Sequence, residues 1–185
     1  YAFFRIFPNS IVMAPKDENE LQHMLATAVE QPHPTAVRYP RGNGIGVPLD
    51  AEFRQLPIGK AEILRRGRHG LVWAIGSTVY PALEAIERLA KEGIEITLVN
   101  ARFVKPLDRE LLALQIDQFG ELEGGARLAT VEEHALAGGF GSAVTEALSE
   151  MELSGVTTLA IGVPDKFVPH GSQEVLRKML GLDAE

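Results

Sequence analysis

Regular alternation of short apolar runs with amphipathic segments is the feature that most constrains how this chain can fold. From Leu71 onward, each apolar run is followed by a stretch with helical periodicity. The expected strands cover residues 71–75, 94–99, 126–131 and 157–161, and the expected helices cover residues 79–92, 106–119, 140–148 and 173–180. Strands that are apolar throughout are typical of parallel sheets covered on both faces. We therefore expect an α/β fold with a mostly parallel, doubly wound sheet.

A shorter unit of the same kind comes first in the chain. We expect a strand at residues 11–15, a helix at 17–30 and a strand ending at Arg38. The helix begins with a capping-box pattern, Asp17 followed by Glu20. Its apolar residues recur at helical spacing, and we expect them to form its buried stripe: Leu21, Met24, Leu25, Ala28 and Val29. His23 lies beside this stripe, so we expect it at the solvent edge.

The two units are separated by a segment rich in chain-breaking residues. Residues 42–57 hold four Gly and Pro breakers in their first half and show no sustained period. We therefore predict an N-terminal unit at residues 1–46, a linker at 47–54 and a C-terminal unit at 55–185. The chain also starts at Tyr1, inside an apolar stretch and without an initiator methionine. We expect the N-terminal unit to be the tail of a larger α/β domain.

Composition excludes several classes of function. A net charge of −7 argues against nucleic-acid binding, which depends on Lys and Arg neutralising phosphates. The chain has no cysteine, which removes disulfides and thiolate metal sites and fits a cytoplasmic protein. No apolar run approaches the ~20 residues of a membrane span. The five histidines show no metal-ligand spacing. We expect no contact with nucleic acid or membrane.

Two arginines at the end of the strand before the linker point to an anionic ligand. Arg38 and Arg41 are separated by Tyr39 and Pro40 and followed by a Gly-Asn turn. Proline stiffens this segment, and ligand-binding residues of α/β proteins gather at the carboxyl ends of strands. A guanidinium matches the planar geometry of carboxylate or phosphate. The alternative is structural: one arginine pairs with a carboxylate or stacks on Tyr39.

A glycine-rich segment, Gly138 to Ser142, connects an expected strand to an expected helix. Backbone N–H groups at a helix N-terminus can hold a phosphate, to which Ser142 would add a hydroxyl. The segment matches neither the Walker loop nor the dinucleotide fingerprint. We therefore favour the structural alternative, a tight turn that lets the helix pack closely on the strand.

Three further places carry polar residues next to expected strands or helices. Glu132, Glu133 and His134 end a strand, where such groups can do acid–base work. Because no second catalytic group is near in sequence, capping of the next helix or binding of a cation from a partner domain is the better interpretation. His170 lies in a turn that could border a cleft, although N-capping by Ser172 explains that turn with less. We expect Trp73 in the core.

Taken together, several segments resemble one family. They are YAFFRIFPN (1–9), VMAPKDENEL (12–21), AVRYPRGNGIGV (36–47), LPIGKAEILRRG (56–67), RFVKPLD (102–108), TVEEHALAGGFGSAV (130–144) and GVPDKFVPHGS (162–172), with GLDA near the end. In this order they are similar to the 1-deoxy-D-xylulose-5-phosphate synthases, thiamine-diphosphate enzymes of the transketolase superfamily. The resemblance covers nearly the whole chain.

The resemblance implies a place in a larger enzyme. Residues 1–46 would be the tail of its pyrimidine-binding domain, and residues 55–185 its transketolase-like C-terminal domain. The implied reaction decarboxylates pyruvate on thiamine diphosphate, with Mg²⁺, and joins the two-carbon unit to D-glyceraldehyde 3-phosphate. The product leads to isoprenoids, thiamin and pyridoxal. A homodimer is also implied.

The resemblance carries over one site residue. Arg41 matches the arginine that contacts the phosphate of glyceraldehyde 3-phosphate, and Arg38 would lie nearby. The family's cofactor, metal and proton-transfer motifs lie upstream of the residues matched here, so we expect no catalytic, cofactor or metal residue in this chain and no activity from it alone. Two alternatives stay open: a binding or scaffold module of the same C-terminal domain type, and the β subunit of a 2-oxo-acid dehydrogenase.

Overall fold

The computed structural model describes all of residues 1–185. Its larger sheet has the strand order β3 (Glu62–Arg65), β5 (Ile96–Asn100), β4 (Gly70–Ala74), β7 (Ala126–Ala135) and β8 (Val156–Val163). The last four strands in this order are mutually parallel, and only β3 runs antiparallel, along β5. The predicted mostly parallel α/β sheet is therefore confirmed.

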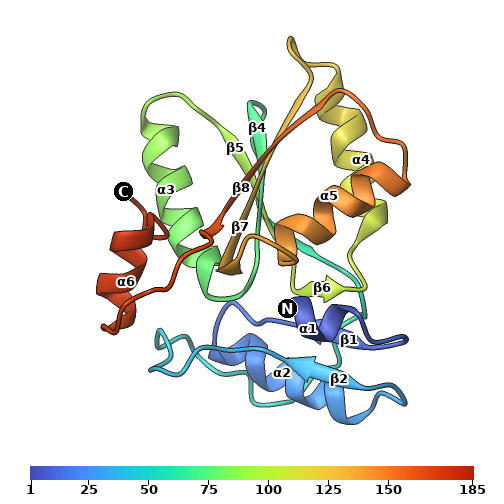
Figure 1. Ribbon diagram of the computed structural model, residues 1–185, viewed down its shortest axis with the longest axis vertical. Coiled ribbons are helices and arrows are strands. Elements are labelled where there is room, and N and C mark those ends of the chain that lie inside the picture. The colour runs from blue at the N-terminus through green and yellow to red at the C-terminus, as the bar shows by residue number, and fades with distance from the viewer.

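Helices cover both faces of this sheet, as expected for a doubly wound fold. Helix α3 (Val79–Lys91) packs on one face, and α4 (Arg109–Gly120) and α5 (Phe140–Glu150) pack on the other (Figure 1). The larger apolar core lies between the sheet and α4 and α5, and it contains Trp73, which is fully buried. The Trp73 indole N–H donates to Gln115 Oε1 at 2.7 Å, so its one polar atom is paired.

The N-terminal unit forms a small second sheet below the first (Figure 1). It contains helix α1 (Ala2–Arg5), strand β1 (Ile11–Met13), helix α2 (Glu18–Val29) and strand β2 (Thr35–Val37), with β1 and β2 parallel. The third strand of this sheet, β6 (Phe103–Lys105), comes from the C-terminal unit and runs antiparallel to β1. The two units therefore share a sheet. The sequence patterns did not predict α1, β3 or β6.

Helix α2 buries only part of the predicted stripe: Met24 is fully buried, and Ala28 packs against the same small apolar cluster. Its buried side chains are mostly polar: Glu20, His23, Met24 and Thr27. Of the predicted stripe, Leu25 is 47% exposed and Val29 80% exposed. The prediction was wrong at these two positions because the buried α2 face carries polar groups, Glu20, His23 and Thr27, beside Met24.

His23 is likewise not at the solvent edge. It is buried, with Nε2 2.8 Å from Asp50 Oδ2, and its Nδ1 accepts a hydrogen bond from the backbone N–H of Arg54 at 3.0 Å. Both partners come from the segment between β2 and β3, which contains no helix or strand. His23 thus fastens this segment to α2. The division of the chain at residues 47–54 stays a prediction.

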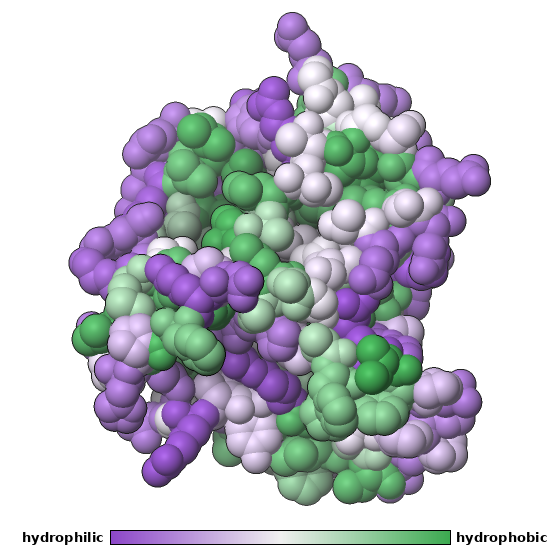
Figure 2. Space-filling view, viewed as in Figure 1, coloured by the Kyte–Doolittle hydropathy of each residue, from purple (hydrophilic) through white to green (hydrophobic).

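The last strand and helix lie at the side of the molecule. Strand β8 is the edge of the larger sheet, and although we expected it to be covered, Leu159 in its centre is 60% exposed. Figure 2 shows apolar residues gathered on the face where β8 runs. Helix α6 (Gln173–Leu180) follows, beside α3, and has no buried residue. No helix of the structure is long and apolar enough to cross a membrane.

Candidate anion site

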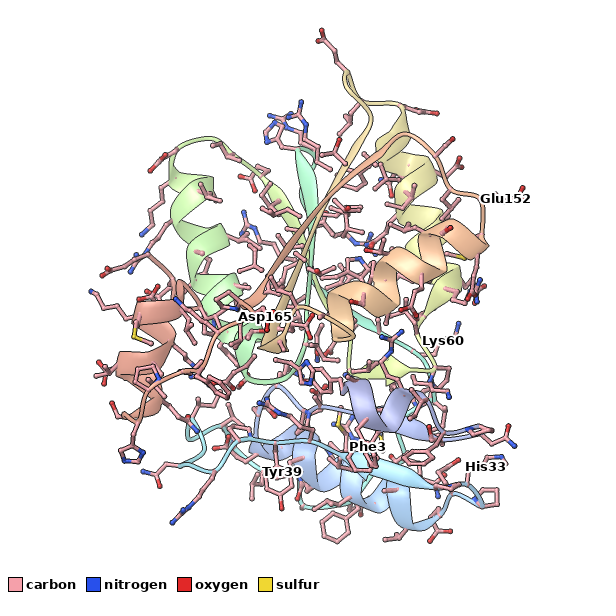
Figure 3. The ribbon with its side chains drawn as sticks, in the orientation of Figure 1. Phe3, His33, Tyr39, Lys60, Glu152 and Asp165 are labelled. Atoms are coloured by element: carbon pink, nitrogen blue, oxygen red, sulfur yellow. The ribbon has the colours of Figure 1, made fainter.

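Arg41 lies in a groove between the two units. The groove has a volume of about 1210 Å³ and is lined by the loop after β2, by α3 and by α6. Figure 3 labels Tyr39 on this loop, which runs below α6 in Figure 1. The Arg41 side chain is exposed and forms no hydrogen bond or ion pair, unlike its backbone carbonyl. Its guanidinium therefore has all of its donors available to an anionic ligand.

Arg38, in contrast, is already paired within the protein. Its Nη2 donates to the backbone carbonyl of Glu133 at 2.8 Å, and its Nη1 lies 3.5 Å from the Glu133 carboxylate. Its guanidinium also lies 5.8 Å from the ring centroid of Tyr1, within the range of a cation–π contact. Arg38 thus fits the structural alternative, in which one arginine pairs with a carboxylate or stacks on a tyrosine. The tyrosine that it contacts is Tyr1 and not Tyr39. Arg41 is the better anion ligand of the two.

Glu133 is the group that joins Arg38 to the C-terminal unit. Its carboxylate accepts a hydrogen bond from Ser77 Oγ at 2.5 Å and pairs with Arg177 Nε at 3.3 Å. Burial alone would raise the pKa of Glu133, but the Ser77 hydroxyl and the guanidiniums of Arg177 and Arg38 hold it below its ordinary value. Glu133 is therefore an ionised structural acceptor at neutral pH, and its pairing with Arg38 agrees with the expected binding of a cation from the other unit.

The backbone of Arg41 is also held by the C-terminal unit. Gln173, the first residue of α6, donates through Nε2 to the Arg41 carbonyl at 2.8 Å. The Gln173 side chain lies against Gly42, where an added Cβ would come within 3.1 Å of it. Neither Gln173 nor Arg177 was singled out from the sequence. They lie more than 130 positions from the loop, and no local pattern signals such a contact.

The glycine-rich segment Gly138–Ser142 does not offer a phosphate site. The backbone N–H groups of Phe140 and Gly141, at the start of α5, donate to the two Glu132 carboxylate oxygens at 2.6 and 2.7 Å. Glu132 is fully buried, so these N–H groups at the helix N-terminus already have an internal carboxyl group as their acceptor. Burial raises the pKa of Glu132, against the opposing effect of these two donors. Glu132 caps the helix, as the structural alternative required.

The remaining polar groups of this segment are paired as well. Ser142 Oγ accepts from the Gly138 N–H and donates to the Leu136 carbonyl, both at 3.0 Å. From α1, Arg5 donates to the carbonyls of Gly138 and Gly139 at 3.0 and 3.2 Å and pairs with Glu146. The favoured interpretation of a packing turn is thus confirmed. The turn also ties α1 to the C-terminal unit.

The two histidines considered as site residues lie in different surroundings. His134 Nδ1 is 3.8 Å from Oε2 of the buried Glu132. His134 stacks on Tyr1, with ring centroids 5.0 Å apart, and burial lowers its pKa. His170 is exposed in the loop before α6, where Ser172 Oγ accepts from the Val175 N–H at 3.4 Å, the predicted N-cap. Neither histidine lines the groove that contains Arg41.

Two observations concern the places where a diphosphate or a metal ion could be held. No group of three or more His, Asp or Glu side chains is placed to hold a cation. The glycine-rich helix N-terminus, the most suitable place for a diphosphate, is filled by the Glu132 carboxylate. The groove with the unpaired Arg41 is therefore the candidate site.

Comparisons with known proteins identify both units. Residues 1–45 match the transketolase pyrimidine-binding domain, and residues 59–185 match the transketolase C-terminal domain. The chain is 57% identical over 99% of its length to 1-deoxy-D-xylulose-5-phosphate synthase 1 of Geobacter metallireducens. It is 48% identical over 98% of its length to the synthase of Halothermothrix orenii. It spans 28% of the length of each of these relatives.

A solved structure shows the same fold over nearly the whole chain. The split-gene transketolase in its inactive β4 tetramer is 33% identical, with a TM-score of 0.85 over 99% of this chain and 57% of that one. The family match covers the C-terminal unit from Gly59 to Glu185, and the sequence identity extends through the N-terminal unit. The chain therefore belongs to the transketolase family, within which it corresponds to the C-terminal portion of the 1-deoxy-D-xylulose-5-phosphate synthases.

Proposed function

We propose that this chain is the C-terminal part of an enzyme that makes 1-deoxy-D-xylulose 5-phosphate. The complete enzyme would decarboxylate pyruvate on thiamine diphosphate, with Mg²⁺, and transfer the two-carbon unit to D-glyceraldehyde 3-phosphate. The product would feed isoprenoid, thiamin and pyridoxal synthesis in the cytoplasm. The names of the relatives support this proposal, as does their identity of about half of all positions.

One observation in the structure carries the role of this chain in that reaction. Arg41 leaves its guanidinium unpaired at the rim of a groove, while Arg38, Glu133 and Gln173 fix the segment around it. A guanidinium without an internal partner, on a backbone held by its neighbours, suits a dianionic phosphate, which can accept two parallel hydrogen bonds from it. We propose that Arg41 binds the phosphate of glyceraldehyde 3-phosphate, with Arg38 as support.

Arg41→Ala in the complete enzyme tests this role. Loss of a charge-assisted contact of about 1.5–3 kcal/mol should raise the KM for glyceraldehyde 3-phosphate by roughly 10- to 150-fold. Pyruvate decarboxylation should stay largely intact. Arg68→Ala is the matched control, because Arg68 is exposed just before β4, at the opposite edge of the sheet from the carboxyl ends. An unchanged KM in Arg41→Ala would remove Arg41 from the site.

We further propose that residues 1–185 alone bind no cofactor and turn over no substrate, and that the complete enzyme is a homodimer. The solved split-gene transketolase is an inactive tetramer of β chains, which is in line with inactivity of a partial chain. Calorimetric titration of this chain with thiamine diphosphate and Mg²⁺ should show no heat of binding. Saturable binding would contradict the proposal.

The same complete enzyme separates the remaining alternatives. Product formation from pyruvate and glyceraldehyde 3-phosphate is expected. Turnover that instead requires a lipoyl acceptor would favour the β subunit of a 2-oxo-acid dehydrogenase. The absence of either activity, in a folded enzyme loaded with cofactor, would favour the scaffold module.

A further inference from the structure

Helix α6 reaches the Arg41 loop although it contributes no buried residue to the core. Gln173, in its first turn, donates to the Arg41 carbonyl at 2.8 Å. Arg177 pairs with Glu133 at 3.3 Å. These two residues are four positions apart, so they lie on the same face of the helix. That face is turned toward the groove, whose lining includes both of them.

These contacts of α6 are connected to those of Arg38, at the start of the same loop. Glu133, which Arg177 contacts, also binds Arg38, three residues before Arg41. The segment from Arg38 to Arg41 is therefore fastened at both ends to the C-terminal unit: at Arg38 through Glu133, and at Arg41 through Gln173. The Arg41 side chain itself makes no hydrogen bond to the protein, in contrast to the Arg41 carbonyl. The backbone is fixed while the guanidinium stays available.

We propose that Gln173 is a positioning residue for the anion site, with Arg177 as its support: α6 is a strap that holds the Arg41 carbonyl and so sets where the guanidinium stands. This inference rests on the proposed function of Arg41. A bidentate contact to phosphate requires both its donors to be correctly placed, so a loop that moves loses part of the contact. The strap would set the affinity for the phosphorylated substrate without touching it.

The test uses Gln173→Met in the complete enzyme. Methionine keeps the side-chain length and the helix propensity but cannot donate to the Arg41 carbonyl. The KM for glyceraldehyde 3-phosphate should rise by roughly three- to tenfold, as for the loss of one neutral hydrogen bond. The rate of pyruvate decarboxylation and the KM for pyruvate should stay the same. Arg177→Met, which releases Glu133 from the helix, should act in the same direction.

Met179→Gln is the matched control. It replaces methionine by glutamine, the reverse of the tested substitution, on the same helix. Met179 is 46% exposed and does not line the groove. Hydrogen–deuterium exchange of the peptide spanning residues 40–46 gives a readout that does not depend on turnover. Exchange there should be faster in Gln173→Met than in the wild type or in Met179→Gln.

The outcomes separate this inference from the proposed function. Faster loop exchange together with a higher KM supports the strap. Unchanged exchange, or an unchanged KM in Gln173→Met while Arg41→Ala raises it, overturns it. If Arg41→Ala itself leaves the KM unchanged, the proposed role of Arg41 fails, and this is visible before any α6 variant is measured.

Discussion

Replacing Glu20 by glutamine should weaken the attachment between the two units. Glu20 lies on α2 and is only 3% exposed. It accepts hydrogen bonds from the backbone N–H of Lys16 at 2.8 Å and from Lys16 Nζ at 3.1 Å. From the C-terminal unit, Asn100 Nδ2 donates at 2.9 Å and Arg102 Nε at 2.7 Å. One carboxylate thus binds both units, and Gln removes its charge while keeping its shape.

The magnitude follows from what each partner loses and keeps. A hydrogen bond to a charged acceptor is worth about 1.5–3 kcal/mol and a neutral one about 0.5–1.5 kcal/mol, so loss of charge toward two cations costs about 2–3 kcal/mol. Breaking a fully buried pair costs more, about 3–5 kcal/mol, because a charge is left alone. In Glu20→Gln, Lys16 and Arg102 would both still pair with Glu62, at 3.2 and 2.8 Å. We therefore expect the smaller loss of unfolding free energy, about 2–3 kcal/mol.

Urea unfolding followed by the fluorescence of Trp73, the single tryptophan, measures this loss. Glu84→Gln is the control: it breaks an exposed pair with Arg88 and should change the free energy of unfolding by no more than about 0.5 kcal/mol. Glu62→Gln completes a double-mutant cycle with Glu20→Gln, and the double variant should lose at least about 1 kcal/mol more than the sum of the single ones. A Glu20→Gln loss no larger than that of Glu84→Gln would refute this reasoning.

One further prediction concerns the Glu20 contacts, and two concern the turn at the start of α5. Burial alone would raise the pKa of Glu20, but Lys16 and Arg102 hold it below its ordinary 4.5. The difference in unfolding free energy between wild type and Glu20→Gln should therefore be full at pH 7 and shrink as the pH falls below about 4.5. Urea titrations at a series of pH values measure this difference. Glu132→Gln places an amide N–H₂ against a buried N–H at the start of α5 and should cost about 2–4 kcal/mol of unfolding free energy. Gly139→Ala sets a Cβ against the Glu132 carboxylate and 2.6 Å from the Ala135 carbonyl, and calorimetry should show a loss of about 2–3 kcal/mol; unaltered melting would mean that the turn is not tightly packed.

The order of strands and helices could be predicted where periodicity reflects burial against the larger sheet. Apolar runs such as residues 71–75 and 126–131 mark strands that are covered on both faces, and the structure places both in the centre of the sheet. In α2 the pattern predicted the burial of Met24 but failed at Leu25 and Val29, because much of the buried face is polar and carries Glu20 and His23. Periodicity of apolar residues cannot report a face that is buried through ion pairs and hydrogen bonds.

The short strands β3 and β6 escaped prediction for a related reason. Strand β6 is only three residues long, Phe103–Lys105, and it exists as a strand because β1 of the other unit pairs with it. Arg102, immediately before it, has a φ of 59°, and its guanidinium is held by Glu20 and Glu62. The chain leaves the larger sheet at this turn. Contacts between units, which are distant in sequence, decide such elements.

The anion site shows the same division between what is local and what is distant. The stiff segment at the end of β2 could be recognised from Pro40 and its flanking arginines, because strand ends and proline act locally. Which of the two arginines is available to a ligand could not be recognised in this way, because it depends on Glu133, 95 positions away from Arg38. Glu133 neutralises Arg38 and Gln173 takes the Arg41 carbonyl, so the fold leaves one guanidinium free on a fixed backbone. Of two arginines that look alike in sequence, Arg38 is paired with the C-terminal unit and Arg41 keeps an unpaired side chain, and contacts made by the C-terminal unit decide this difference.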